Sequence, residues 1–146
     1  MTTKKILHVL SLCLIGLCAS GILMVSIMAF INPQSVMALV GVSLPNTDAY
    51  SSIRGVYGGA GLTICIILVY LAIKNSKQGL LCMALLCSLY AISRLITIFA
   101  EGNLGEFGQQ WLLIESSMAV LALLVYGLRA NYEKYAHRTS QIIATS

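Results

Sequence analysis

Charged residues are scarce in this chain, and their scarcity excludes most of what a soluble domain of this length would do. Asp, Glu, Lys and Arg make up 10% of the 146 residues, whereas hydrophobic residues make up 58%. A typical soluble domain has roughly a quarter of its residues charged. The chain also has little of the alternation between polar and apolar positions that gives an element of a soluble protein its solvated face. These deficits exclude an ordinary soluble fold.

Metal-binding and redox motifs are missing as well. The chain has no C-x-x-C motif, and its five cysteines lie within apolar stretches, where cysteine behaves as a small hydrophobe. These cysteines are Cys13, Cys18, Cys65, Cys82 and Cys87. The two histidines, His8 and His137, lie near opposite ends of the sequence and do not form the paired axial ligands that a haem needs. We therefore predict no metal site and no cofactor.

What the chain does have is four long apolar stretches separated by short polar segments. Each is close to the length that a helix needs to cross ~30 Å of hydrocarbon at ~1.5 Å per residue. The stretches are Ile6–Ile31, Ile53–Ile73, Leu80–Ala100 and Trp111–Leu128. They predict an all-α integral membrane protein, built as a bundle of four transmembrane helices in a single domain over residues 1–146, with a polar tail over residues 129–146.

The basic residues predict the orientation of this bundle. Lys and Arg cluster before the first stretch, between the second and third, and after the fourth. The residues concerned are Lys4, Lys5, Lys74, Lys77, Arg129, Lys134 and Arg138. The segments on the other side, Asn32–Ser52 and Glu101–Gln110, carry no Lys or Arg. By the positive-inside rule both termini lie in the cytoplasm of a bacterial inner membrane. Basic residues at helix ends form no patch for nucleic acid, so we predict membrane lipids as partners, with a membrane protein or a second copy of the chain left open.

A cleaved signal peptide is the alternative for the N-terminus. Lys4-Lys5 followed by apolar residues resembles one, and Cys18-Ala19-Ser20-Gly21 offers small residues for cleavage. The apolar stretch continues to Ile31, however, which is too long for the hydrophobic part of a signal peptide. We therefore expect an uncleaved first helix.

The first outward segment has the start and stop signals of a short helix. Asn32 can accept a backbone N–H bond, Pro33 fits the first helical position, and Gly41 can end the helix. A short helix at the membrane interface and an irregular loop fit this pattern about equally, and both stay open here.

Four charged residues in the outward third of the predicted bundle are the candidates for a functional role. Arg94 lies about 9 Å inside the end of the third stretch, and Glu115 lies at a similar depth in the fourth. Arg54 and Glu101 lie nearer the same surface. An unpaired charge at such depth costs a few kcal/mol or more, so we expect Arg94 and Glu115 to form an ion pair.

Helical spacing gathers further polar residues around this pair. The predicted cluster consists of Arg54, Tyr57, Tyr90, Arg94, Thr97, Glu101 and Glu115. Two interpretations stay open: an ion-paired staple that joins three helices, or an outward-facing polar pocket for a small anionic or amphiphilic ligand. The glycines that open the second stretch, Gly55, Gly58, Gly59 and Gly61, predict close helix packing, within the chain in preference to a dimer, and would leave space beside Arg54.

These residues resemble a known family. The run Arg54-Gly55-Val56-Tyr57-Gly58-Gly59 resembles the R-x-x-Y-G-G signature of small bacterial four-helix membrane proteins that are catalogued only as a domain of unknown function. Ser93-Arg94-Leu95, Glu101-Gly102 and Glu115 are similar to its second block, and Asn32-Pro33 with Gly41 matches its first loop. The resemblance covers about Asn32–Leu128 and implies the fold and the membrane location, but no activity.

Three classes of function follow from these observations. The first is a non-catalytic membrane protein, either an accessory subunit or a binder of lipid or small amphiphiles at the outward cluster. The alternative is a small transporter or channel subunit that uses Glu101 and Glu115 as proton or cation sites. A membrane enzyme fits least well, because the chain has no histidine cluster, nucleophile motif or metal-ligand spacing.

Overall fold

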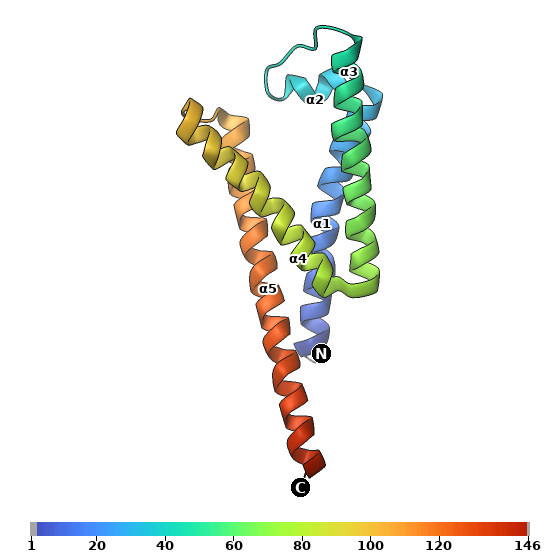
Figure 1. Cartoon of the computed structure of the whole chain (residues 1–146), viewed down its shortest axis with the longest axis vertical. Coiled ribbons are helices and arrows are strands. Elements are labelled where there is room, and N and C mark those ends of the chain that lie inside the picture. Colours follow the sequence, from blue (N-terminus) through green and yellow to red (C-terminus); the bar gives the residue numbers. More distant parts are fainter. Residues whose placement is uncertain (1–2, 146) are drawn as a thin grey trace.

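A computed structural model describes residues 3–145, except for the side chains at positions 136, 137, 139, 140 and 142–145. His137 therefore lies outside the described side chains. The described chain is helical almost throughout (Figure 1). Its elements are α1 (Thr3–Ile31), α2 (Pro33–Ala38), α3 (Thr47–Ile53), the π-helix η1 (Arg54–Ala60), α4 (Gly61–Glu101) and α5 (Glu106–Thr145). The all-helical prediction is confirmed.

The segment after α1 forms the short helix that its sequence signals allow. Asn32 has extended backbone angles (φ −144°, ψ 94°), and its side chain accepts a hydrogen bond of 3.1 Å from Gln34 N. Pro33 opens α2, and Gly41 (φ +70°) lies in the left-handed region just beyond the helix, where glycine carries no Cβ penalty. The Gln34 side chain then bonds to the backbone of Val42 and Leu44 and holds the following loop. The irregular-loop alternative is thereby rejected.

From Thr47 the chain runs as one continuous helical rod through α3, η1 and the first part of α4. Asn46 caps its start by accepting a bond of 2.9 Å from Ala49 N. The rod begins earlier than the predicted Ile53, because Thr47–Ser52 is too polar to register as a membrane stretch although its cap starts a helix.

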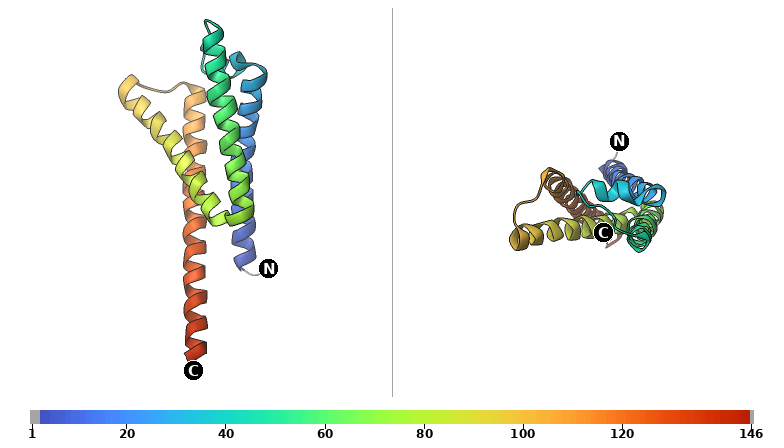
Figure 2. Two further views of the ribbon diagram at one scale, coloured as in Figure 1. Left: turned by 45° about the vertical axis from the view of Figure 1, so that its right-hand side comes forward. Right: turned by 90° about the horizontal axis from the view of Figure 1, so that it is seen from above.

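The chain reverses direction within α4 at a single residue. Asn75 (φ −155°, ψ 82°) is non-helical, and the chain folds back there between residues 74 and 76 (Figures 1 and 2). We call the two parts of α4 the first limb (61–74) and the second limb (76–101). The Asn75 side chain accepts a bond of 3.3 Å from Gln78 N and caps the second limb. We call the end of the molecule at this bend, where the N-terminus also lies, the basic end, and the opposite end the loop end.

The core lies between α1, the two limbs of α4 and α5. Its fully buried side chains include Ile15 of α1, Leu68 of the first limb, and Leu80 and Met83 of the second limb. Gly79 brings the second limb against α1, because a Cβ there would lie 2.8 Å from the Cδ1 atom of Ile15. Towards the loop end the second limb and α5 diverge from α1 and the first limb (Figures 1 and 2).

The outer surface of the bundle is apolar. Phe99 is 88% exposed and Ile31 and Ile73 are each 76% exposed, an arrangement that water does not favour but hydrocarbon does. Three segments, Thr3–Ile31, Thr47–Glu101 and Glu106–Tyr135, are long and apolar enough to cross a membrane. By length and composition these helices suit a protein that spans a membrane.

Helix α5 is longer than its apolar stretch. The sequence places the end of the fourth stretch at Leu128, whereas the helix continues to Thr145. Hydropathy finds only the part that suits hydrocarbon, and the following residues are polar but include good helix formers such as Ala130, Glu133 and Lys134. At ~1.5 Å per residue the whole helix is about 60 Å long, roughly twice the hydrocarbon thickness.

Candidate functional site

The expected ion pair between the second limb and α5 is present. Arg94 donates from Nε to Glu115 Oε2 at 2.6 Å and from Nη2 to Glu115 Oε1 at 2.8 Å. The two side chains are 22% and 11% exposed. This parallel two-bond geometry is the strongest that arginine and a carboxylate adopt, and it neutralises both charges in place. The similar depth of the two residues was sufficient to predict their pairing.

Two tyrosines accompany the pair. Tyr90 lies one helical turn before Arg94 on the second limb, and Tyr57 belongs to η1. Both phenols lie near enough to Arg94 to interact with its charge, but neither hydroxyl is hydrogen-bonded to Arg94 or Glu115 among the described residues. Tyr57 is 38% exposed and Tyr90 is 49% exposed. The phenols are therefore accessible from outside the bundle.

The other residues of the predicted cluster make different contacts. Arg54 is exposed and donates from Nε to the backbone oxygen of Phe30, at 3.2 Å, which ties η1 to the end of α1. Thr97 donates its hydroxyl to the Ser93 backbone oxygen of its own helix. Glu101 is exposed at the end of the second limb. The contacts therefore centre on Arg94 and Glu115, and the two arginines and two glutamates do not form one mutually neutralised group among the described residues.

The four glycines of the second stretch divide into two kinds. A Cβ at Gly58 would lie 3.1 Å from the ring of Phe30, and a Cβ at Gly61 would collide with Ser26 Oγ, so these two bring the rod against α1. Gly55 has open space around its Cβ position, and Gly59 meets only a backbone oxygen of its own helix. The G-x-x-x-G pair is therefore not the pair that packs within the chain.

The signature run Arg54-Gly55-Val56-Tyr57-Gly58-Gly59 coincides with the π-helix η1. A π-helix bonds each N–H to an oxygen five residues earlier. Such segments are rare in proteins, and those that occur are often found at functional sites. The extra residue per turn changes which side chains share a face, so the α-helical spacing that groups Arg54 with Tyr57 does not hold there. The density of glycines was the sequence signal for an irregular helix in this run.

A second polar network at the basic end was missed by the sequence reasoning. Arg129 of α5 donates from Nη1 to Ser11 Oγ of α1 at 3.0 Å and to Ser76 Oγ at the bend of α4 at 2.8 Å. His8 Nδ1 lies 3.1 Å from the same Ser76 oxygen. Ser11 and Ser76 are buried. Serine is common in apolar helices, so neither Ser11 nor Ser76 stood out in the sequence as a partner for Arg129.

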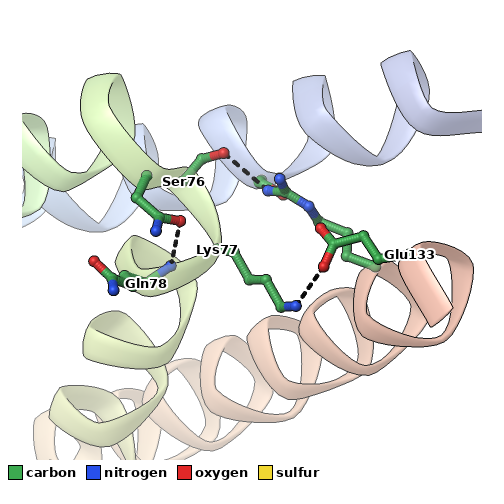
Figure 3. A network of polar contacts seen from close by, with 7 residues as sticks. Ser76, Lys77, Gln78 and Glu133 are labelled. Atoms are coloured by element: carbon green, nitrogen blue, oxygen red, sulfur yellow. Dashed lines mark hydrogen bonds and ion pairs between the residues drawn. The ribbon is translucent and has the colours of Figure 1, made fainter. Parts of the chain in front are cut away.

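Lys77 extends this network at the bend. Its Nζ lies 2.6 Å from Glu133 Oε2 of α5 (Figure 3). The same Nζ lies 5.6 Å from the centre of the Tyr126 ring. The pair is much more exposed than Arg94 and Glu115, with side chains that are 27% and 51% exposed. The polar residues at the bend therefore attach it to α5. They do not form the solvated loop that their composition suggests.

The cysteines lie mainly in the core. Cys65 and Cys87 are buried there, Cys18 and Cys82 pack against it, Cys13 is exposed, and all are free thiols. Cys65 donates to the Ala19 backbone oxygen at 3.5 Å. Among the side chains that the structure describes, no group of three His, Cys, Asp or Glu residues has the arrangement of a metal site.

One known family matches the chain over residues 10–126, and this family is described as a domain of unknown function, DUF4345. The match covers well over half of the sequence. The chain belongs to the DUF4345 family. The DUF4345 region includes η1, the ion pair of Arg94 and Glu115, and the bend at Asn75. No curated protein and no solved structure matches the chain.

Proposed function

We propose that this DUF4345 protein crosses the inner membrane of a bacterium four times, with both termini in the cytoplasm. The bend at Asn75 supports this topology, because it divides the long segment Thr47–Glu101 into two antiparallel parts. Residues 47–74 and 76–101 are each about 40 Å long, enough to cross ~30 Å of hydrocarbon. Seven of the nine Lys and Arg residues lie towards the basic end, which the positive-inside rule assigns to the cytoplasm.

Within that membrane we propose a non-catalytic role, as an accessory protein that binds a small amphiphile at the loop end. The site consists of Tyr57, Tyr90, Arg94 and Glu115. One observation carries the proposal: the ion pair uses Nε and Nη2 of Arg94 and leaves Nη1 without a hydrogen-bond partner among the described residues. Two partly exposed phenols, Tyr57 and Tyr90, lie near enough to Arg94 to interact with its charge.

An amphiphile has the chemistry that these groups would recognise. Its anionic or polar head can accept a bond from Arg94 Nη1 and from the tyrosine hydroxyls, while its hydrocarbon tail can lie along the apolar surface of the second limb. Leu95, Ile96 and Phe99 are exposed on that limb and are 43%, 60% and 88% accessible. A pair that has already neutralised itself suits binding better than acid–base catalysis, because neither member is free to give or take up a proton.

The experiment measures thermal unfolding of the purified full-length protein in detergent while sodium oleate is titrated in. We expect oleate to raise the melting temperature of the wild type. Tyr57→Phe and Tyr90→Phe should weaken oleate binding roughly threefold to tenfold, because each removes one hydrogen-bonding hydroxyl. The matched control is Tyr70→Phe, which removes the hydroxyl of a phenol that is 59% exposed on the first limb.

Equal oleate stabilisation of the wild type and all three variants would mean that the fatty acid binds the apolar surface without using this site. In that case the ion pair would be a structural staple, and the binding function would be withdrawn.

A further inference from the structure

A cavity opens between α1 and α5 at the basic end, on the opposite side of the membrane from the amphiphile site. Its volume is about 80 Å³, several times the ~15 Å³ that a single water molecule needs. It is lined by Lys4, Leu7, His8, Arg129, Tyr132 and Glu133. We call it the basic-end cavity. All six lining residues lie outside residues 10–126, so the match to DUF4345 does not extend to it.

Arg129 is held in place at this cavity by neutral partners. Its Nη1 atom bonds to Ser11 and Ser76, which fixes the guanidinium but does not offset its charge. Among the described residues, no carboxylate lies within salt-bridge distance of Arg129. Glu133, one helical turn further along α5, is the carboxylate nearest to Arg129 in the sequence. A half-buried, immobilised guanidinium without a counter-charge is a receptor for an anion.

The carboxylate that lines the cavity is already engaged. Glu133 Oε2 lies 2.6 Å from Lys77 Nζ, so its negative charge is offset from outside the cavity (Figure 3). Lys4 adds a second positive charge to the lining, from the first turn of α1. The cavity therefore has a net positive character that the protein itself does not neutralise.

We propose that the basic-end cavity binds the phosphate group of an anionic membrane lipid. Arg129 and Lys4 offset the phosphate charge, and the Tyr132 hydroxyl supplies a further hydrogen bond. A lipid fits best as the source of the phosphate, because Leu7 in the cavity lining belongs to the apolar helix α1, along which a hydrocarbon chain can lie. Basic pockets between membrane helices on the cytoplasmic side are suited to such head groups, since the cytoplasmic leaflet is rich in anionic lipids.

The experiment uses full-length protein in a neutral detergent and counts bound molecules by native mass spectrometry. Three probes are titrated separately: phosphatidylglycerol, phosphatidylcholine and inorganic phosphate. We expect phosphatidylglycerol to bind in preference to the other two. Lys4→Gln should weaken this binding roughly fivefold, the effect of removing one cationic side chain near an anionic head group. Lys5→Gln is the matched control, because it removes the same charge from the neighbouring residue, which does not line the cavity.

Arg129→Gln should weaken phosphatidylglycerol binding more than Lys4→Gln does. This variant also loses bonds to two buried serines and can fail to fold, so the decision rests on the two lysine variants. Equal weakening by Lys4→Gln and Lys5→Gln would overturn the proposal, because it would assign the binding to general surface charge. Equal binding of phosphatidylcholine, or binding of inorganic phosphate in preference to the lipid, would overturn it as well.

Discussion

Two ion pairs with the same shortest distance, 2.6 Å, allow a direct test of how burial sets the strength of a charge pair in this protein. Arg94→Ala leaves Glu115 with a side chain that is 11% exposed and no cationic partner among the described residues. Removing one partner of a buried pair costs about 3–5 kcal/mol. Because the Arg94 side chain is 22% exposed, we expect the lower end of that range, about 3 kcal/mol.

The exposed pair supplies the control. Lys77→Ala leaves Glu133, which is 51% exposed and regains water when its partner is lost. A pair of this kind contributes about 0.2–1 kcal/mol. The expected difference between the two variants is therefore about 2 kcal/mol or more, which corresponds to more than a tenfold change in the folding equilibrium.

The measurement is equilibrium unfolding in mixed micelles, followed by circular dichroism, at one protein and one detergent concentration. Glu115→Gln should cost less than Arg94→Ala, about 1–2 kcal/mol, because the amide oxygen still accepts a bond from the guanidinium. The double variant Arg94→Met with Glu115→Leu should recover most of the stability, since no uncompensated charge remains. If Arg94→Ala cost no more than Lys77→Ala, the pair would not be shielded from water and the reasoning from depth would be refuted.

Two further predictions test the topology and the packing. A reporter enzyme fused after Ser146 should be active only on the cytoplasmic side, as the seven basic residues of the basic end require; activity outside would mean that one limb does not cross the membrane. Gly61→Val should destabilise the protein by roughly 1–3 kcal/mol, because its side chain would collide with Ser26 of α1. Gly55→Ala, with open space at its Cβ position, should be neutral or slightly stabilising in the same unfolding assay, and equal effects of the two changes would contradict the assigned packing.

Hydropathy predicts where helices occur in this chain but not where they end. The four apolar stretches all lie within observed helices, because burial in hydrocarbon imposes a composition that is easy to recognise. The ends at Thr47 and Thr145 were not predicted, since helices in water are set by caps and by local propensity. The bend was expected to be a polar loop, yet one non-helical residue, Asn75, is enough when its side chain caps the next helix.

Depth along a helix predicts a partner better than spacing around it. Arg94 and Glu115 were paired from their depth alone, and the pair is present. The face assigned to Arg54 assumed α-helical spacing, which the π-helix η1 does not follow. The contacts of Arg129 with Ser11 and Ser76 join residues 118 and 53 positions apart, and nothing in the local sequence of either serine indicates them.

The length of α5 has a mechanical consequence. The helix runs without interruption from Glu106 at the loop end to Thr145, and its final part extends beyond the rest of the bundle (Figure 1). The carboxylate of Glu115, near one end, is fixed to the second limb, and Glu133, beyond the middle, is fixed to the bend. A rigid rod of about 60 Å transmits a tilt from one end to the other. A tilt of roughly 10° about its middle, with both attached partners moving along, would displace the C-terminal end by ~5 Å, so a shift of the second limb would be carried to the far end of α5.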